Sequence, residues 1–313
     1  MYLNKSFQME DKNGLMLVFF TAIISGFSIY VSSIGVKEFD SSIFTFLKNA
    51  AVAIFLFAII AGFKNFTDLK KLERKQWAQL VLIGLIGGSI PFLLFFQGLK
   101  MTSGATSGFI HKTLFIYATI FAIVFLKEKP AKGIFIGAIL LLIGNYLLIR
   151  PDFKFAQGHL LVFAAVLFWA AENTYAKYVL KNFSGTVVAF GRMFFGSIFI
   201  LIFLIIAGKI SLLSNLTLTH AKWVFLSSIF LLLYVLTFYN GLKQIKVTTA
   251  TGILALGSPI TTLLAWIFSN KQPTLNDSIG MLLIVAGIIS IVWMSSILKY
   301  VSNFFGAKEY GRH

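Results

Sequence analysis

Ten long apolar segments, separated by short polar connections, run through almost the whole chain. Each is close to the roughly 20 residues that a helix needs to cross about 30 Å of hydrocarbon. The segments lack the strict two-residue alternation of barrel strands, so we predict membrane-spanning helices. Their approximate limits are 14–35, 42–63, 77–97, 104–126, 131–149, 158–180, 185–207, 221–241, 247–269 and 277–297.

The apolar pattern occurs twice along the chain. Residues 98–144 align without a gap with residues 241–287, at a constant spacing of 143 residues. A weaker match, at a spacing of 144 residues, relates the parts that precede these segments. We therefore predict two repeats of five helices each, over residues 14–149 and 158–297. The matched pairs include Gly98 and Gly241, Gly137 and Gly280, Gly144 and Gly287, Gly14 and Gly158, and Lys48 and Arg192.

An odd number of crossings per repeat makes the second repeat enter the membrane from the opposite side. We therefore expect the repeats to be inverted, as in several families of secondary transporters. Cytoplasmic loops are enriched in Lys and Arg. Seventeen of these residues fall on the side of the two termini, many of them in the loop at 64–76, against seven on the other side. The sequence thus predicts cytoplasmic termini.

Composition agrees with a chain that lies in the lipid bilayer. Hydrophobic residues make up 58% and charged residues 12%, and the mean hydropathy is +0.87. The basic loop at 64–76 accounts for part of the net charge of +16 without nucleic acid, because basic loops favour anionic lipid. The chain has no cysteine, which excludes disulfides and thiol chemistry. We expect no cofactor and no metal.

The first repeat carries a recognisable motif. It contains Gly-Leu-Lys at 98–100, a Gly-rich and Thr-rich start of the fourth helix at 102–108, and Phe-Leu-Lys-Glu-Lys-Pro at 125–130. With Gly137 and Gly144, this resembles the EamA repeat of the drug/metabolite transporter superfamily. The resemblance implies an all-α integral membrane protein, with ten transmembrane helices as two inverted five-helix EamA repeats around a central cavity.

The two copies divide the family's features between them. The first has Glu128 where the second has Lys271, and the second has Pro259 where the first has Ile116. The resemblance implies transport of a small metabolite, often outward. It does not transfer a fixed substrate site.

Polar groups deep in hydrocarbon are costly and usually face a cavity or a partner, so they are the candidate site residues. At about 1.5 Å per residue, Lys48, His111 and Lys112 lie at a similar depth on the outer side. Glu172 and Arg192 share a depth on the inner side, and we predict that they form an ion pair. The alternative is that this pair only orients the helices.

Helical geometry ranks some of these candidates. His111 and Lys112 are about 100° apart on a helix, so we expect one of them to face the cavity and favour Lys112. For Lys48 and Arg192 the alternative is snorkelling, in which a long side chain lifts its charge to the interface.

The sixth helix adds Trp169, Asn173 and Tyr175 beside Glu172. For these two aromatic residues the alternative is packing or interfacial anchoring, which is the commoner role of Trp and Tyr in membranes. Tyr239 falls at a predicted helix end, where we expect solvent.

The sequence therefore predicts a secondary transporter that moves an amino acid or organic acid across the plasma membrane. The family resemblance implies that it works as an exporter. Protons are a candidate coupling ion, through Glu172 or His111. A nucleotide-sugar or phosphate-ester antiporter is the alternative. A channel lacks a filter sequence and an intramembrane enzyme lacks a recognisable catalytic set.

Overall fold

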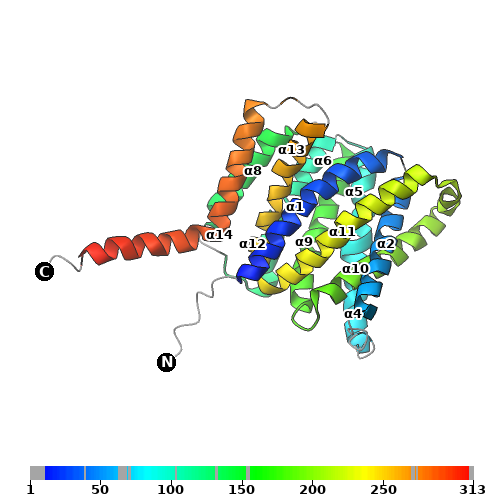
Figure 1. The fold of residues 1–313 in the computed structure, drawn as a ribbon, viewed down its shortest axis with the longest axis horizontal. Coiled ribbons are helices and arrows are strands. Elements are labelled where there is room, and N and C mark those ends of the chain that lie inside the picture. Colours follow the sequence, from blue (N-terminus) through cyan, green and yellow to red (C-terminus); the bar gives the residue numbers. More distant parts are fainter. Residues whose placement is uncertain are drawn as a thin grey trace.

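The computed structural model describes residues 11–38, 40–62, 69, 72–102, 104–130, 133–152, 156–268, 272 and 274–309. Most of the basic loop predicted at 64–76 lies outside these residues, as do Lys271 and Pro273. The described chain forms a bundle of tilted helices (Figure 1).

The helices are α1 (Lys12–Gly35), η1 (Val36–Glu38), α2 (Ser41–Gly62), α4 (Arg74–Ile83), η2 (Gly84–Ser89), α5 (Ile90–Lys100), α6 (Gly104–Lys112), α7 (Leu114–Leu126), α8 (Ile134–Ile149), α9 (Gln157–Val179), α10 (Gly185–Ile206), η3 (Ile210–Asn215), α11 (Leu218–Gln244), α12 (Val247–Ile253), η4 (Leu254–Leu256), α13 (Gly257–Phe268) and α14 (Leu275–Glu309).

Within the described residues, 8 helical stretches are long and apolar enough to cross a membrane. The other two predicted spans correspond to α8 and α9. Helix α8 has 16 residues, about 24 Å of rise, and α9 has 23 residues but carries Glu172, Asn173 and Lys177. The prediction of an all-helical membrane protein is confirmed for this part of the chain, and the count of ten crossings stays a prediction.

Three of the predicted spans contain an irregular turn. The third span contains a π-helix, η2, between α4 and α5. The Leu85 carbonyl accepts the Ile90 backbone amide of this π turn and also the Ser89 hydroxyl, the latter at 2.9 Å. The fourth span turns at Thr113, and the ninth passes through the 3₁₀ turn η4.

Helices of the two predicted repeats are interleaved. Helix α1 packs against α11, and α5 packs against α9, while α2 contacts α10 and α8 contacts α14. In the sequence repeat α1 corresponds to α9 and α5 corresponds to α11. The contact of α1 with α11 is therefore equivalent to the contact of α9 with α5. The packing therefore follows the same correspondence as the sequence alignment.

Matched glycines lie at the two equivalent crossings. A Cβ atom added to Gly98 would come within 2.7 Å of the Gly158 carbonyl oxygen, and one added to Gly14 within 3.3 Å of the Gly241 carbonyl oxygen. Gly14 aligns with Gly158, and Gly98 with Gly241. Small residues let helix backbones approach closely, which drives helix association where no hydrophobic effect operates between helices.

A second pair of crossings joins α8 to α14. A Cβ atom on Gly144 would lie 2.7 Å from the Gly280 carbonyl oxygen, and one on Gly137 would lie 2.7 Å from the Gly287 carbonyl oxygen. In the sequence repeat Gly144 aligns with Gly287 and Gly137 with Gly280, so each glycine of α8 contacts the glycine that aligns with the other one. Backbone contact along α8 explains why this short helix is held firmly against the bundle.

The start of α1 and the point where α14 leaves the bundle lie at the same end of the structure (Figure 1). Beyond that point the last part of α14 projects from the bundle. At this end Glu128, which follows α7, accepts hydrogen bonds from the Val247 and Thr248 backbone amides at 2.9 and 3.3 Å. A carboxylate at the start of α12 complements the helix dipole, so Glu128 ties α7 to α12.

We predict that Gly144→Ala destabilises the protein by about 1–3 kcal/mol, because the new methyl group forces α8 away from α14. Thermal unfolding of the purified protein in detergent measures this loss. Gly62→Ala is the matched control, since a Cβ atom there meets nothing within 4 Å. Equal melting temperatures for the two variants would contradict backbone contact at this crossing.

Candidate functional site

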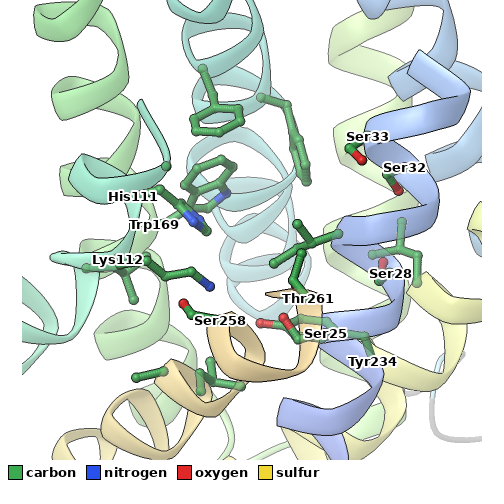
Figure 2. Close-up of a pocket in the computed structure, with 18 of the residues that line it drawn as sticks. Ser25, Ser28, Ser32, Ser33, His111, Lys112, Trp169, Tyr234, Ser258 and Thr261 are labelled. Carbon is green, nitrogen blue, oxygen red and sulfur yellow. The ribbon is translucent and has the colours of Figure 1, made fainter. Parts of the chain in front are cut away.

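A cavity of about 710 Å³ lies between the two halves of the bundle (Figure 2). Its lining extends from Arg192 and Trp169, which are both buried, to Ser33 near the end of α1 and Lys37 in η1, which are both exposed. The cavity therefore opens at the end of the bundle opposite to the start of α1. Its volume falls in the range of ordinary small-molecule sites.

One wall of the cavity carries hydroxyl groups. Ser25, Ser28 and Ser32 follow one another along one face of α1, and Ser33 adjoins them (Figure 2). Serines recurring at helical spacing in an apolar span are a signal that the sequence analysis missed. Hydroxyl groups from α12 and α13 complete this side of the cavity; they belong to Thr251, Ser258, Thr261 and Thr262.

The opposite wall is aromatic and centres on Trp169. Its ring lies 5.3 Å from Phe92, 5.5 Å from Phe95 and 5.2 Å from His111, between ring centroids. The Trp169 indole donates a hydrogen bond to the Gly87 carbonyl at 3.2 Å. This bond fixes the ring orientation and satisfies the indole N–H in an otherwise apolar setting.

Three cationic side chains face the cavity from within the bundle. The Lys48 ammonium lies 5.2 Å from the centroid of Phe44 and 5.9 Å from that of Phe92, which are cation–π distances. Lys48 is only 5% exposed, so its charge stays in the bundle instead of reaching the interface. Lys112 points into the open space of the cavity (Figure 2), and Arg192 lines its floor.

Arg192 belongs to a buried polar network. Its Nη1 donates to the Tyr239 hydroxyl at 3.0 Å, and that hydroxyl donates to Glu172 Oε1 at 2.5 Å. Arg192 Nη1 also lies 3.8 Å from Glu172 Oε2. The structure thus brings together the two residues predicted to pair, and Tyr239 bridges them. The expectation that Tyr239 is solvated was wrong, because α11 continues to Gln244 and Tyr239 is 0% exposed.

The π-helix connects this network to the aromatic wall. The Gly87 carbonyl accepts from Trp169, and the Gly88 carbonyl accepts from the Asn49 amide at 3.0 Å. Gly87 also packs against the side chain of Glu172, where a Cβ atom would collide with the carboxylate stem. A π-helix frees carbonyl groups, and here side chains of two other helices use them.

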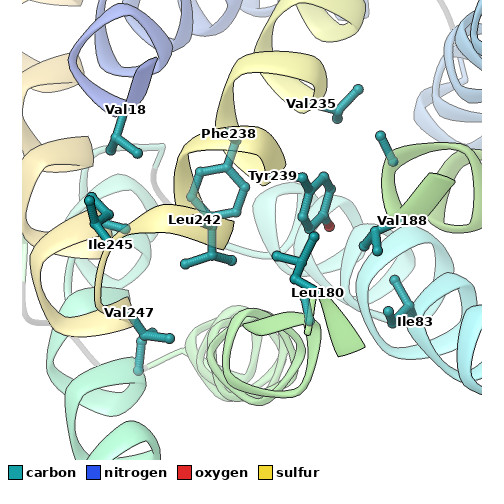
Figure 3. Packing of buried hydrophobic residues seen from close by; sticks show 14 of the residues in the cluster. Val18, Ile83, Leu180, Val188, Val235, Phe238, Tyr239, Leu242, Ile245 and Val247 are labelled. Carbon is teal, nitrogen blue, oxygen red and sulfur yellow. The ribbon is translucent and has the colours of Figure 1, made fainter. Parts of the chain in front are cut away.

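Below the network the bundle is closed by tightly packed apolar side chains, which we call the inner seal. They surround Tyr239 at the end of the bundle away from the cavity mouth (Figure 3). All are buried, and none of them is among the described lining residues of the cavity. The inner seal comprises Val18, Leu180, Val188, Phe238, Leu242, Ile245 and Val247.

The structure distributes the candidate residues over two places. Both His111 and Lys112 reach the cavity because α6 ends at Lys112, so the expectation that only one would face it was wrong. Glu172 lies behind the cavity floor, and Tyr175 stacks on Tyr178 at 6.3 Å outside the lining. The candidates that line the cavity are Lys48, His111, Lys112, Trp169, Asn173 and Arg192.

The fold and this cavity define a helical membrane protein whose bundle encloses a cavity of small-molecule size. The chain belongs to the EamA-like transporter family, which matches residues 12–150 and again residues 156–293. Family membership makes the protein a membrane transporter.

Several uncharacterised transporters are similar along most of their length. One from Archaeoglobus fulgidus is 22% identical, over 90% of this chain and 97% of its own. The Bacillus subtilis transporter YyaM is 23% identical, over 93% of this chain and 97% of its own. A solved crystal structure with 18% sequence identity has a TM-score of 0.73, over 92% of this chain and 99% of that chain, and supports the fold.

We predict that Tyr239→Phe lowers the free energy of unfolding by about 1–3 kcal/mol, because a buried guanidinium and carboxylate lose the hydroxyl between them. Unfolding in detergent, followed by circular dichroism, measures this change. Tyr234→Phe is the control. The Tyr234 ring stacks on Phe238 at 5.6 Å between centroids, and its hydroxyl forms no hydrogen bond in the described structure. Equal destabilisation of the two variants would show that the network adds nothing beyond packing.

Proposed function

We propose that this protein is a secondary transporter, working as an exporter, for small organic acids or amino acids. The observation that carries the proposal is the charge of the cavity. Lys48, Lys112 and Arg192 face it, and no Asp or Glu occurs among its described lining residues. A low-dielectric cavity whose described lining carries cations and no acid favours a ligand that brings a carboxylate.

Alternating access of two inverted five-helix repeats is the proposed mechanism, with residues 14–149 and 158–297 as the repeats. The cavity is open at one end and the inner seal closes the other, which corresponds to one of the two states that such a carrier needs. Rocking of the interleaved repeats would open the inner seal and narrow the mouth between α1, α5 and α6. Because the described helices pack through small residues, backbone crossings are available as pivots.

The proposed location is the plasma membrane, with both termini in the cytoplasm. The excess of basic residues on that side supports this orientation. In this orientation the described cavity opens to the outside. Proton coupling through Glu172 or His111 belongs to the same proposal: Glu172 contacts the cavity-lining Arg192 both directly and through Tyr239, and His111 lines the cavity itself.

A phosphate-ester or nucleotide-sugar antiporter is the second candidate. The same three cations favour it, since Lys and Arg bind phosphate as readily as carboxylate. The cavity wall opposite to the aromatic residues carries hydroxyl groups that suit a sugar. Competition between carboxylates and phosphate esters in one assay separates the two candidates.

We predict saturable counterflow of an organic anion or amino acid in proteoliposomes, and a loss of about tenfold or more with Lys112→Met, because a charge-assisted contact disappears. Uptake of radiolabelled solute against unlabelled internal solute measures it. Lys222→Met is the matched control, since Lys222 is exposed and lies outside the lining. Uptake that does not saturate would indicate a channel, and chemical change of the solute would indicate an enzyme.

The orientation gives a separate prediction, for which the lack of native cysteine provides a clean background. A single cysteine at Ser211, between α10 and α11, should react with a membrane-impermeant maleimide in intact cells. A single cysteine at Asn182, between α9 and α10, should react only after the membrane is permeabilised. Both positions are exposed, so packing does not protect either. The reverse labelling pattern would place the termini outside.

A further inference from the structure

The cavity combines a ring-lined wall with cations but offers no carboxylate. Four of its described lining residues are cationic, namely Lys37 at the mouth and Lys48, Lys112 and Arg192 within. On this basis, and resting on the proposed function, we infer that the transported solute is a ring-bearing carboxylate without an ammonium group. The inference narrows the solute class from organic and amino acids to aromatic acids.

The carboxylate would bind near Lys112. Arg192 already shares its charge with Glu172 through Tyr239, and Lys48 lies against the rings of Phe44 and Phe92. Lys112 forms no ion pair or hydrogen bond in the described structure and points into the open cavity (Figure 2). Of the three cations within the cavity, Lys112 would therefore be stabilised most by a bound anion.

Two hydroxyl groups of the cavity lining have no hydrogen-bond partner among the described residues and could donate to a bound ligand. The side-chain oxygens of Ser32 and Ser258 are buried and have no hydrogen-bond partner in the described structure. Both residues line the cavity (Figure 2), and Ser258 is 5% exposed. A buried polar atom without a partner is costly, so these hydroxyls gain by donating to a ligand oxygen.

The ring of the solute would lie against the aromatic wall. The ring of Trp169 makes tilted or edge-to-face contacts, at interplanar angles of 82° to Phe92, 57° to Phe95 and 78° to His111. None of these three rings therefore covers the face of Trp169 by parallel stacking. Phe92 and Phe95 remain partly exposed on the cavity side. A flat ligand ring suits edges and faces arranged in this way.

An ammonium group would be disfavoured in the same space. A ligand small enough to place a carboxylate on Lys112 would hold an α-ammonium only a few ångströms away, among like charges that the low dielectric hardly screens. Hydroxyl groups accept hydrogen bonds from an ammonium, but none of the lining residues described supplies a negative charge. Amines and zwitterions should therefore bind more weakly than the matched acid.

Three compounds with the same phenyl-ethyl body test this directly: 3-phenylpropionate, phenylalanine and phenethylamine, with hexanoate as the carboxylate without a ring. Titration calorimetry on the purified protein measures binding, so passive leakage of weak acids through lipid does not interfere. We expect 3-phenylpropionate to bind at least about tenfold tighter than each of the others. Phenethylamine should give no measurable heat of binding.

Variants assign the two parts of the site. Lys112→Met should weaken 3-phenylpropionate at least about tenfold, while Lys222→Met leaves it unchanged. Phe95→Leu should reduce the preference for 3-phenylpropionate over hexanoate and spare the binding of hexanoate. A cooperative unfolding transition for each variant ensures that a loss of binding is not a loss of fold.

The outcomes separate this inference from the proposed function. Phenylalanine binding as tightly as 3-phenylpropionate would overturn the inference and leave an amino-acid transporter. Hexanoate binding equally well would overturn the requirement for a ring. No binding of any of the four to folded protein would overturn the inference as a whole, while saturable counterflow of another solute would still support the proposed function.

Discussion

The contact of Arg192 with Glu172 through Tyr239 is the constraint to which the surrounding structure is fitted. A guanidinium and a carboxylate inside a membrane protein are costly unless each is paired and hydrogen-bonded. The tyrosine hydroxyl accepts from one and donates to the other, at 3.0 and 2.5 Å. The glycine at position 87 leaves room for the carboxylate, and the π-helix around it supplies the carbonyl that holds Trp169. The cavity floor and the aromatic wall thus depend on the same short segment.

Much of the fold was visible in the sequence because its signals are local. Long apolar runs predict helices, and matched glycines predict the repeat, which the packing of α1 on α11 and α5 on α9 follows. The depth argument brought Glu172 and Arg192 together correctly. The features that the sequence did not predict depend on packing between segments that are distant along the chain. Tyr239 looked like a helix-end residue until α11 proved longer, and the hydroxyl groups on α1 became meaningful only when those of α13 lay beside them at the cavity.

The two halves bring corresponding positions to one cavity and use them differently. Lys48 and Arg192 are counterparts in the repeat, and both reach the cavity. One rests on aromatic rings and the other on a tyrosine and an acid. Lys112 has Ala255 as its counterpart, which also lines the cavity but brings no charge. Duplication supplied the frame, and divergence of a few side chains made the cavity asymmetric.

The interleaved crossings also set the order in which the chain reaches its final structure. Helix α1 finds its main neighbour in α11, which begins at Leu218, about two hundred residues later. During synthesis α1 is therefore in the membrane before the helix that it finally packs against has been made. Such long-range contacts are formed late and slow the folding of a chain. The glycine-lined face of α1 must stay available to its partner throughout that interval, which makes late assembly a built-in property of the duplicated architecture.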